Sequence, residues 1–398
     1  MQTVVLAAGQ GTRMRPLTDR RPKPMVPVAD RPLVGHTLAD AAASGADRFV
    51  VVVGYERSSI EDAFGTEHAG VPIEYVEQRH QRGTADAVRA AVDALEDDPF
   101  VVVNGDALYD RAGLTALYDG GPAVGSVRAA DPTQYGVLDV ADGLATGVVE
   151  KPSDPPSDLV NAGAYVFPAA AREWLDVAES ERGEYELTDV VARTIDRTDV
   201  RAVAFDRWLD VGRPWELLAA NEWKVEELAS ERERVDGAVS DDATLRGPVA
   251  VESGATIREG VTIEGPALVR AGATVGPTAY IRGTTLVGPD AEVGHAVEVK
   301  NSVLMAGASV SHLSYVGDSI VGRDVNLGAG TTVANLRHDD RPVELTVKGE
   351  RVSTGRRKFG VVVGDGAKTG INVSLNAGVT VGTDALVGPG ETVVRDVE

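Results

Sequence analysis

Apolar residues recur at every sixth position over much of the C-terminal half, and this spacing limits the fold more than any other feature of the sequence. Neither an α-helix, with about 3.6 residues per turn, nor a strand, with its two-residue alternation, produces a period of six. Units such as Val251-Glu-Ser-Gly-Ala-Thr are typical of a parallel β-helix, in which one apolar residue per face stacks coil on coil. The apolar positions are Val239, Leu245, Val251, Ile257, Ile263, Val269, Val275, Ile281, Val287, Val293 and Val299, and the period resumes at Val321, Leu327 and Val333 and at Leu375, Val381, Val387 and Val393.

Residues 336–360 interrupt this period, and we expect them to protrude from the coils as a loop. The segment carries seven basic and four acidic residues, a net +3 in a chain whose formal net charge is −22. Its densest basic part comprises Arg351, Arg356, Arg357 and Lys358. Two interpretations stay open, a solvated surface loop and a loop that binds an anionic ligand.

The first 235 residues have a different pattern, in which short apolar runs alternate with helical segments. Continuous apolar runs such as residues 49–53 are typical of strands that are buried on both faces. This pattern predicts an α/β domain over residues 1–235, with a Rossmann-like mixed sheet that is mostly parallel, and a β-helix domain over residues 236–398. We expect strands at 3–7, 49–53 and 100–103 and helices at 33–44, 85–95 and about 214–234.

The composition excludes several classes of function. A net charge of −22 argues against a nucleic-acid-binding protein, which needs a basic surface. No apolar run is long enough to span a membrane. The absence of cysteine excludes disulfides, thiolate metal sites and a cysteine nucleophile, and it favours a cytoplasmic location. The 7 lysines against 32 arginines favour a halophilic protein, with an ordinary acidic enzyme as the alternative.

A glycine-rich loop, Leu6-Ala-Ala-Gly-Gln-Gly-Thr-Arg13, follows the first expected strand. Such loops let backbone N–H groups approach phosphates, and Arg13 adds a positive charge. The segment continues through Met14-Arg-Pro-Leu-Thr18 to Arg21-Pro-Lys-Pro-Met25. Over this length it resembles the sugar-1-phosphate nucleotidylyltransferases, in which the loop holds a nucleoside triphosphate and the lysine contacts its phosphates.

Later segments resemble the same family in the same order. Asp106 ends an expected buried strand, where a carboxylate can face a ligand crevice. The resemblance implies catalytic roles for Arg13 and Lys23 and a Mg²⁺ site at Asp106 and Asp210. It implies nucleotide binding by Ala8, Gly9, Gly11, Thr12, Gln81, Gly83 and Thr84. It implies sugar-phosphate binding by Gly136, Glu150, Lys151 and Asn161.

The segment from Glu298 to Asp318 resembles the acetyltransferase half of the bifunctional GlmU family, which implies a left-handed β-helix that takes acetyl-CoA as co-substrate. Within this segment, a neutral imidazole at His312 could take the proton from the attacking amine, as acyl transfer from a thioester requires. A lone histidine is more often a polar residue on a turn. Here the neighbouring positions Lys300 and Tyr315 and two asparagines match the same family, which favours catalysis. The resemblance implies acetyltransferase substrate binding by Arg282, Lys300, Tyr315, Asn326 and Asn335.

The chain departs from bacterial members at Asn335-Leu336, where those have Asn-Tyr, and resembles the archaeal bifunctional branch. We expect acetyl transfer to glucosamine-1-phosphate or galactosamine-1-phosphate, followed by Mg²⁺-dependent uridylyl transfer from UTP. Since acyl-CoA sites in such β-helices lie between neighbours, the expected assembly is a homotrimer or a multiple of it. We hypothesise that Arg356, Arg357 and Lys358 reach CoA or a sugar phosphate across that interface.

Two other functions stay open. One is a single-activity glucose-1-phosphate uridylyl- or thymidylyltransferase with a structural β-helix, and the other is a non-catalytic sugar-nucleotide sensor. The choice among UTP, dTTP and GTP depends on loop geometry that the sequence does not show. All expected partners are small molecules, and neither nucleic acid nor membrane is among them.

Overall fold

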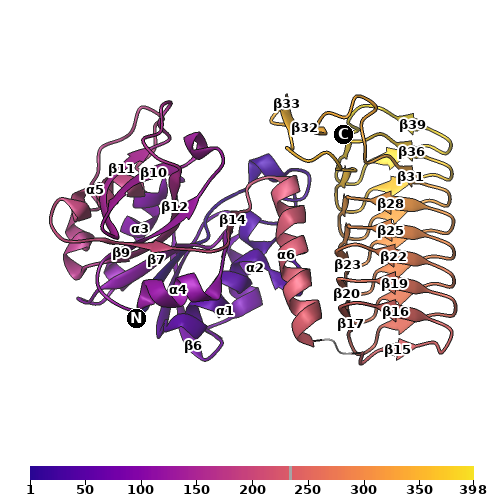
Figure 1. The fold of residues 1–398 in the computed structure, drawn as a ribbon, viewed down its shortest axis with the longest axis horizontal. Coiled ribbons are helices and arrows are strands. Elements are labelled where there is room, and N and C mark those ends of the chain that lie inside the picture. Colours follow the sequence, from indigo (N-terminus) through magenta and orange to yellow (C-terminus); the bar gives the residue numbers. More distant parts are fainter. Residues whose placement is uncertain (233–234) are drawn as a thin grey trace. The chain divides into compact units, whose positions relative to one another are not determined.

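The computed structural model describes residues 1–232 and 235–398. The chain divides into two compact units (Figure 1). The first comprises Met1–Gln10, Arg21–Val26 and Pro32–Asp210, and the second comprises Gly11–Arg20, Pro27–Arg31 and Val211–Glu398. Within the described ranges, no helix is long and apolar enough to cross a membrane.

A ten-stranded mixed sheet forms the centre of the first unit. Its middle strands β4 (Arg48–Val53), β1 (Gln2–Leu6) and β7 (Phe100–Asn104) are almost wholly buried, and their valines pack on both faces of the sheet. Helices α1 (Leu33–Ser44), α2 (Arg57–Phe64), α3 (Thr84–Ala90), α4 (Arg111–Tyr118) and α5 (Leu187–Ile195) complete the unit. The strand order is β10 (Gly136–Ala141), β11 (Leu144–Glu150), β13 (Arg201–Ala204), β9 (Ala123–Arg128), β12 (Leu159–Phe167), β7 (Phe100–Asn104), β1 (Gln2–Leu6), β4 (Arg48–Val53), β6 (Val71–Glu77) and β5 (Glu67–His68).

The expectation of a mostly parallel sheet is wrong for one half of it. Strands β7, β1, β4 and β6 are parallel neighbours, but β12 runs antiparallel to both β7 and β9. Strands β10 and β11 form an antiparallel hairpin whose turn includes Asp142 and Gly143, both with positive φ. A tight turn of this kind can only join antiparallel strands, and the Asp-Gly dipeptide was a sequence signal for it.

The helix expected at 85–95 is also shorter than predicted. Helix α3 ends at Ala90, and the chain continues as a 3₁₀ turn over Val92–Ala94. The N–H groups of Ala91 and Ala94 donate to the carbonyls of Val88 and Ala91, an i→i+3 pattern that tightens the last turn.

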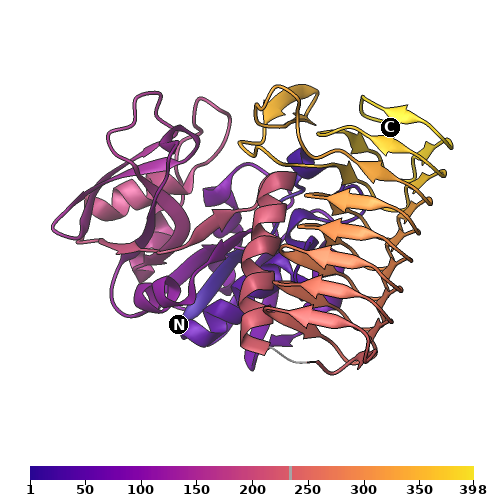
Figure 2. The ribbon, with the colours of Figure 1, turned by 45° about the vertical axis from the view of Figure 1, so that its right-hand side comes forward.

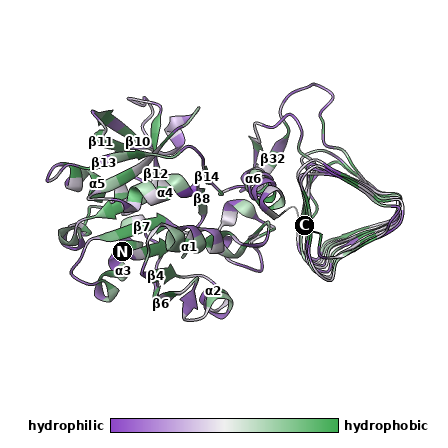
Figure 3. Ribbon diagram, turned by 60° about the horizontal axis from the view of Figure 1, so that its bottom comes forward, coloured by the Kyte–Doolittle hydropathy of each residue, from purple (hydrophilic) through white to green (hydrophobic). Residues whose placement is uncertain are grey.

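The repeats of the second unit form three parallel sheets that the chain visits in turn, so that the strands stack as in a β-helix (Figure 2). Figure 3 shows these coils end on, with a triangular outline. We call the sheets the first, second and third faces. The first contains β15 (Ala238–Val239), β18 (Thr256–Ile257), β21 (Thr274–Val275), β24 (Glu292–Val293), β27 (Ser309–Val310), β30 (Asn326–Leu327), β35 (Lys368–Thr369) and β38 (Leu386–Val387). The second contains β16 (Thr244–Arg246), β19 (Thr262–Glu264), β22 (Tyr280–Arg282), β25 (Glu298–Lys300), β28 (Tyr315–Gly317), β31 (Thr332–Val333), β36 (Ser374–Leu375) and β39 (Thr392–Val393). The third contains β17 (Val249–Val251), β20 (Ala267–Val269), β23 (Thr285–Val287), β26 (Val303–Leu304), β29 (Ile320–Val321), β34 (Val362–Val363) and β37 (Thr380–Val381).

The coils continue without a break between Val299 and Val321, where the six-residue period is lost in the sequence. Val287 pairs with Leu304, and Leu304 pairs with Val321, each 17 positions apart, whereas Val269 and Val287 are 18 apart. One residue is therefore missing from each of two successive corners between the second and third faces. The inward side chains remain in the core because the deletions fall at the corners.

The segment 336–360 leaves the coils at the same corner and is not an open loop. It contains a hairpin of β32 (Glu344–Val347) and β33 (Glu350–Ser353), and Val343, Leu345 and Phe359 are buried. The guanidinium of Arg351 donates to the carbonyls of Glu344 and Gly378, which fastens the hairpin to a later coil. Apolar residues at alternating positions within this basic segment were the signal for its folded structure.

Helix α6 (Pro214–Arg232) packs against β17, β20 and β23 of the third face. The helix expected at 214–234 is thus found over its described length, and residues 233 and 234 lie outside the described residues. Because α6 contacts the coils, it groups with the repeats in the second compact unit.

Candidate active sites

A pocket of ≈ 320 Å³ opens in the first unit beyond the ends of β1 and β7. Its walls come from the glycine-rich loop after β1, the loop that precedes α3 and the end of β7. Gln81 donates from Nε2 to the Ala8 carbonyl at 2.6 Å, which ties two of these walls together. Of the residues expected to bind nucleotide or metal, the pocket brings together Ala8, Gly9, Gln81, Gly83, Thr84 and Asp106.

The wall at Gly83 depends on the absence of a side chain. Gly83 has φ 113°, and a Cβ placed on it would lie 2.4 Å from the carbonyl oxygen of Tyr185. The Tyr185 backbone in turn bonds to Arg82 and Ala85 on either side of this glycine. The loop can therefore run close against the Tyr185 backbone only with glycine at this position.

Gly83→Ala is expected to destabilise the first unit by about 2 kcal/mol and to raise the KM for the nucleotide, because the pocket wall must move. Thermal unfolding and steady-state pyrophosphate release measure the two effects. Gly70→Ala is the matched control, since Gly70 also has positive φ but a Cβ there meets nothing within 4 Å. Equal effects of the two substitutions would contradict a role for the close contact at Gly83.

Lys23 lies between two carboxylates beside this pocket. Its Nζ is 2.8 Å from Oδ2 of Asp106 and 3.5 Å from Oδ1 of Asp210, and the lysine is almost fully buried. The two aspartates meet because β8 (Ala107–Tyr109) pairs antiparallel with β14 (Trp208–Asp210), in a register that sets Asp210 opposite Ala107. Burial raises the pKa of the neighbouring Tyr109 well above its usual value, so its hydroxyl stays protonated.

This donor set suits a hard cation shared with phosphates. Carboxylate oxygens are the protein ligands that Mg²⁺ prefers, and it keeps several waters or substrate oxygens. Over residues 1–232 and 235–398, no group of three or more potential metal ligands forms a closed cage. Two carboxylates that already converge on one ammonium group fit a Mg²⁺ ion that takes its other ligands from phosphates and water.

The remaining residues of the glycine-rich loop belong to the second compact unit. Gly11 has φ 74°, and Thr12 and Arg13 follow in a 3₁₀ turn over Thr12–Met14. The hydroxyl of Thr18 donates to the Gly11 carbonyl at 2.8 Å and closes the turn. Further along, Thr383 donates to Asp19 at 2.9 Å and Arg20 pairs with Asp384, so this segment is bonded to the last coils.

The residues expected to hold the sugar phosphate form a cluster on the antiparallel half of the sheet. Gly136 and Glu150 are direct partners in the β10–β11 hairpin, and a Cβ on Gly136 would lie 3.6 Å from Cβ of Asn161. Lys151 and Arg182 approach the Glu150 carboxylate at 3.5 and 3.6 Å. Burial, opposed by Lys151, raises the pKa of Glu150 above its usual value. Asn161 is buried, accepts from Gly163 N–H and donates to Tyr165.

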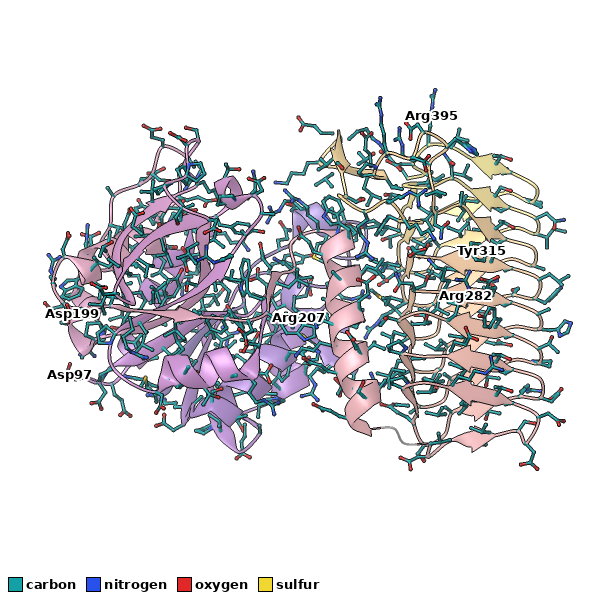
Figure 4. All side chains as sticks on the ribbon, in the orientation of Figure 1. Asp97, Asp199, Arg207, Arg282, Tyr315 and Arg395 are labelled. Atoms are coloured by element: carbon teal, nitrogen blue, oxygen red, sulfur yellow. The ribbon has the colours of Figure 1, made fainter. Side chains whose placement is uncertain are left out.

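In the second unit, four of the residues expected in acetyl transfer lie on or just beyond the second face. Arg282 and Lys300 are direct partners on β22 and β25, and Tyr315 on β28 is the partner of Glu298. Figure 4 labels Arg282 and Tyr315 on these coils. Asn335 follows β31, the next strand of this face after β28, and donates to the Tyr315 hydroxyl at 3.2 Å. Arg282 bonds to Glu298 at 2.8 Å.

Asp318 is the centre of this cluster, although the sequence analysis named it only as the end of the Glu298–Asp318 segment and not as a site residue. It is 3% exposed, and its carboxylate accepts from Lys300 at 2.6 Å, from Asn301 at 3.0 Å and from Asn335 at 2.5 Å. Asn301 was missed as well. The one sequence signal that could have pointed to Asn301 is its place in a polar corner directly after Lys300.

His312 and Asn326 lie elsewhere in the coils. His312 is exposed on the corner between β27 and β28, where the first face meets the second. Asn326 is exposed on β30 of the first face. One chain therefore groups Arg282, Lys300, Tyr315 and Asn335 on or beside the middle strands of the second face and carries His312 at the corner between the first and second faces.

Two of the three basic residues expected to reach a ligand are held by the chain itself. Arg356 donates from both terminal nitrogens to Glu222 of α6, and Arg357 bonds to Asp340 at 2.7 Å. Lys358 is exposed. Because the Arg356 guanidinium is already bonded to Glu222, it could bind a ligand phosphate only by giving up or sharing that contact.

The comparisons with known proteins cover the whole chain. The family model described as nucleotidyl transferase matches residues 2–227, and the model described as GMPPB C-terminal domain matches residues 263–359. The bifunctional protein GlmU of Methanococcus vannielii is 39% identical over all of this chain and 96% of its own length. The bifunctional sugar-1-phosphate nucleotidylyltransferase/acetyltransferase of Sulfurisphaera tokodaii is 36% identical over all of this chain and 98% of its own.

Two further comparisons concern the first half. A UTP–glucose-1-phosphate uridylyltransferase of Haloferax volcanii is 39% identical over 54% of this chain and 92% of its own length. Among solved structures, a UDP-glucose pyrophosphorylase complexed with UDP-glucose matches with a TM-score of 0.53 at 24% identity, over 57% of this chain and 98% of that one. The structural match supports the fold of the first half.

Proposed function

The chain belongs to the family of bifunctional GlmU-type sugar-1-phosphate nucleotidylyltransferase/acetyltransferases, and on that premise we propose that it makes UDP-N-acetylglucosamine in two steps. In the first step, acetyl-CoA acetylates glucosamine-1-phosphate. In the second, UTP and N-acetylglucosamine-1-phosphate give UDP-N-acetylglucosamine and pyrophosphate. Residues 1–235 would serve nucleotidyl transfer and residues 236–398, as a left-handed β-helix, acetyl transfer.

The position of Lys23 between Asp106 and Asp210 is the observation that best supports the proposed nucleotidyl transfer. A phosphate oxygen of the sugar must attack the α-phosphorus while pyrophosphate leaves, which brings several negative charges together. Lys23, and Arg13 from the glycine-rich loop, would neutralise charge on the leaving pyrophosphate. Asp106 and Asp210 would hold Mg²⁺, which supplies further charge neutralisation when bound. No general base is required, since the attacking phosphate is already ionised.

The remaining pocket residues would bind and orient the two substrates. The open backbone at Ala8 and Gly9, continued by Gly11 and Thr12, suits the triphosphate, and Gln81, Gly83 and Thr84 suit the base. Gly136, Glu150, Lys151 and Asn161 would contact the sugar phosphate. The lysine at 151 supplies a positive charge, and the half-buried Glu150 supplies a hydroxyl acceptor.

Paired charges support an acceptor that carries both an ammonium group and a phosphate. Arg282 is paired with Glu298 and Lys300 with Asp318, so the cluster is locally neutral. A sugar phosphate without an amine carries only negative charge, and it would find both cations already paired with carboxylates. A hexosamine-1-phosphate would offer its phosphate to Arg282 and Lys300 and its amine to the carboxylates, with Tyr315, Asn326 and Asn335 as further contacts.

For acetyl transfer, His312 would accept the proton that the attacking amine loses as it bonds to the thioester carbon. The C–S bond then breaks, and the CoA thiolate leaves and is protonated. The separation of His312 and Asn326 from the other cluster within one chain supports a site completed by neighbouring subunits, and hence the proposed homotrimer. The acidic, cysteine-free composition supports a halophilic, cytoplasmic enzyme.

A single-activity glucose-1-phosphate uridylyltransferase is the second candidate, favoured by the relative from Haloferax volcanii. Pyrophosphate release with each nucleotide and each sugar phosphate separates the two. We expect UTP with N-acetylglucosamine-1-phosphate to give at least about a tenfold higher kcat/KM than UTP with glucose-1-phosphate. A preference for glucose-1-phosphate, or for dTTP or GTP over UTP, would contradict the proposed reaction.

A further inference from the structure

The Asp318 cluster extends beyond the coils to helix α6. We define the cluster as Lys300, Asn301, Asp318 and Asn335. The amide nitrogen of Asn301 lies 3.0 Å from Oδ1 of Asp318 and 2.8 Å from Oε1 of Glu222, which is on α6. An Asn amide has two hydrogens, so it can donate to both carboxylates at once. Asn301 therefore joins Glu222 to the residue that holds Lys300.

Glu222 also holds the base of the 336–360 insertion. Arg356 donates to both oxygens of the Glu222 carboxylate, one of the contacts being 3.1 Å. Each of the two side chains is 26% exposed, so the pair is partly shielded from solvent. One carboxylate on α6 thus fixes both the corner that carries Asn301 and the point where the insertion rejoins the coils.

The backbone at this corner shows why an outside contact is needed. Asn301 and Asp318 are non-glycine residues with φ of 45° and 51°, in the left-handed region. These are the corners at which each coil is one residue shorter. Asn and Asp tolerate this region better than most residues, but it still costs conformational energy that neighbouring contacts must offset. The hydrogen bonds that Asn301 donates to Glu222 and to Asp318 supply such contacts.

We propose that Glu222 and Arg356 are positioning residues for the acyl-acceptor site, acting through Asn301 and Asp318 on the Lys300 ammonium. The inference rests on the proposed acetyl transfer, in which Lys300 holds the sugar phosphate. Without the Glu222 charge, Asn301 donates to a weaker, neutral acceptor and Arg356 loses its carboxylate partner. The Asp318 side chain is then less firmly held, and Lys300 no longer has one fixed position.

Glu222→Gln tests this, with Glu226→Gln as the matched control on the same helix. Glu226 is exposed, so its change should leave both activities as they are. For Glu222→Gln we expect the KM for glucosamine-1-phosphate to rise about tenfold, with the KM for acetyl-CoA and the rate of pyrophosphate release unchanged.

The outcomes separate this inference from the function it rests on. If the unchanged protein releases no thiol that depends on the amino sugar, both the positioning role and the proposed acetyl transfer are overturned. Thiol release by the unchanged protein with the same acceptor KM in Glu222→Gln overturns the positioning role alone. A parallel fall of both activities and of the melting temperature in Glu222→Gln would also overturn it, since that pattern indicates a purely structural residue.

Discussion

Asp106→Asn is expected to reduce pyrophosphate release by about 100-fold or more, because it removes one of the two negative charges that converge on the Lys23 ammonium. Asn has nearly the same shape as Asp, so the pocket walls should stay in place. Lys23 keeps its second carboxylate at Asp210, so the buried ammonium is not left without a partner. The loss should therefore appear in kcat with Mg²⁺ present, and it should not be recovered by raising the nucleotide concentration.

The control for this substitution is Asp119→Asn. Asp119 is exposed at the end of α4, and its change removes the same charge away from the pocket. Thermal unfolding should be nearly the same for the two variants. Asp106→Asn with normal pyrophosphate release would show that Asp106 does not hold the metal, and the assignment of this pocket would fail.

His312→Ala is expected to lower thiol release from acetyl-CoA by about 100-fold or more and to leave pyrophosphate release unchanged. The imidazole is exposed on its corner, so its removal costs little packing. The effect should lie in kcat, since the proton transfer belongs to the chemical step. Both activities are measured on one sample, so a misfolded preparation would be recognised at once.

His295→Ala provides the control, because His295 lies at the same corner between the first and second faces one coil earlier. Its Nδ1 is 3.2 Å from the Thr278 hydroxyl. Normal activity of His295→Ala with loss in His312→Ala would locate the base. Equal, small effects of the two changes would instead reduce His312 to one polar residue in a column of corner side chains.

The sequence predicted the stacked coils because each face admits one inward side chain per unit, and Val251, Ile257 and Ile263 reveal that constraint directly. The shortened corners escaped prediction for a physical reason. Removing one residue at a turn leaves the inward positions filled but shifts the spacing from Val299 to Leu304 to five, so a strict period of six loses the register. Helix α1 was predicted with its observed ends, since Pro32 and Gly45 flank it.

The contacts that organise the candidate sites were not accessible from sequence. Glu222 lies 79 positions from Asn301 and 134 from Arg356, and no local pattern connects residues so far apart. The same holds for the segment after Gly11, whose Asp19 and Arg20 bond to Thr383 and Asp384 of the last coils. Pattern and resemblance named Lys23, Asp106 and Asp210 individually, whereas only the β8–β14 pairing explains how they meet.

The most direct test of a bifunctional enzyme is thiol release from acetyl-CoA with glucosamine-1-phosphate, in high KCl, with pyrophosphate release measured on the same sample. Because the chain has no cysteine, any free thiol that appears comes from CoA. We predict thiol release that depends on the amino sugar and disappears in His312→Ala. A sample that releases pyrophosphate but no thiol, with either glucosamine- or galactosamine-1-phosphate, would contradict the account and leave the coils as a scaffold for a single nucleotidylyltransferase.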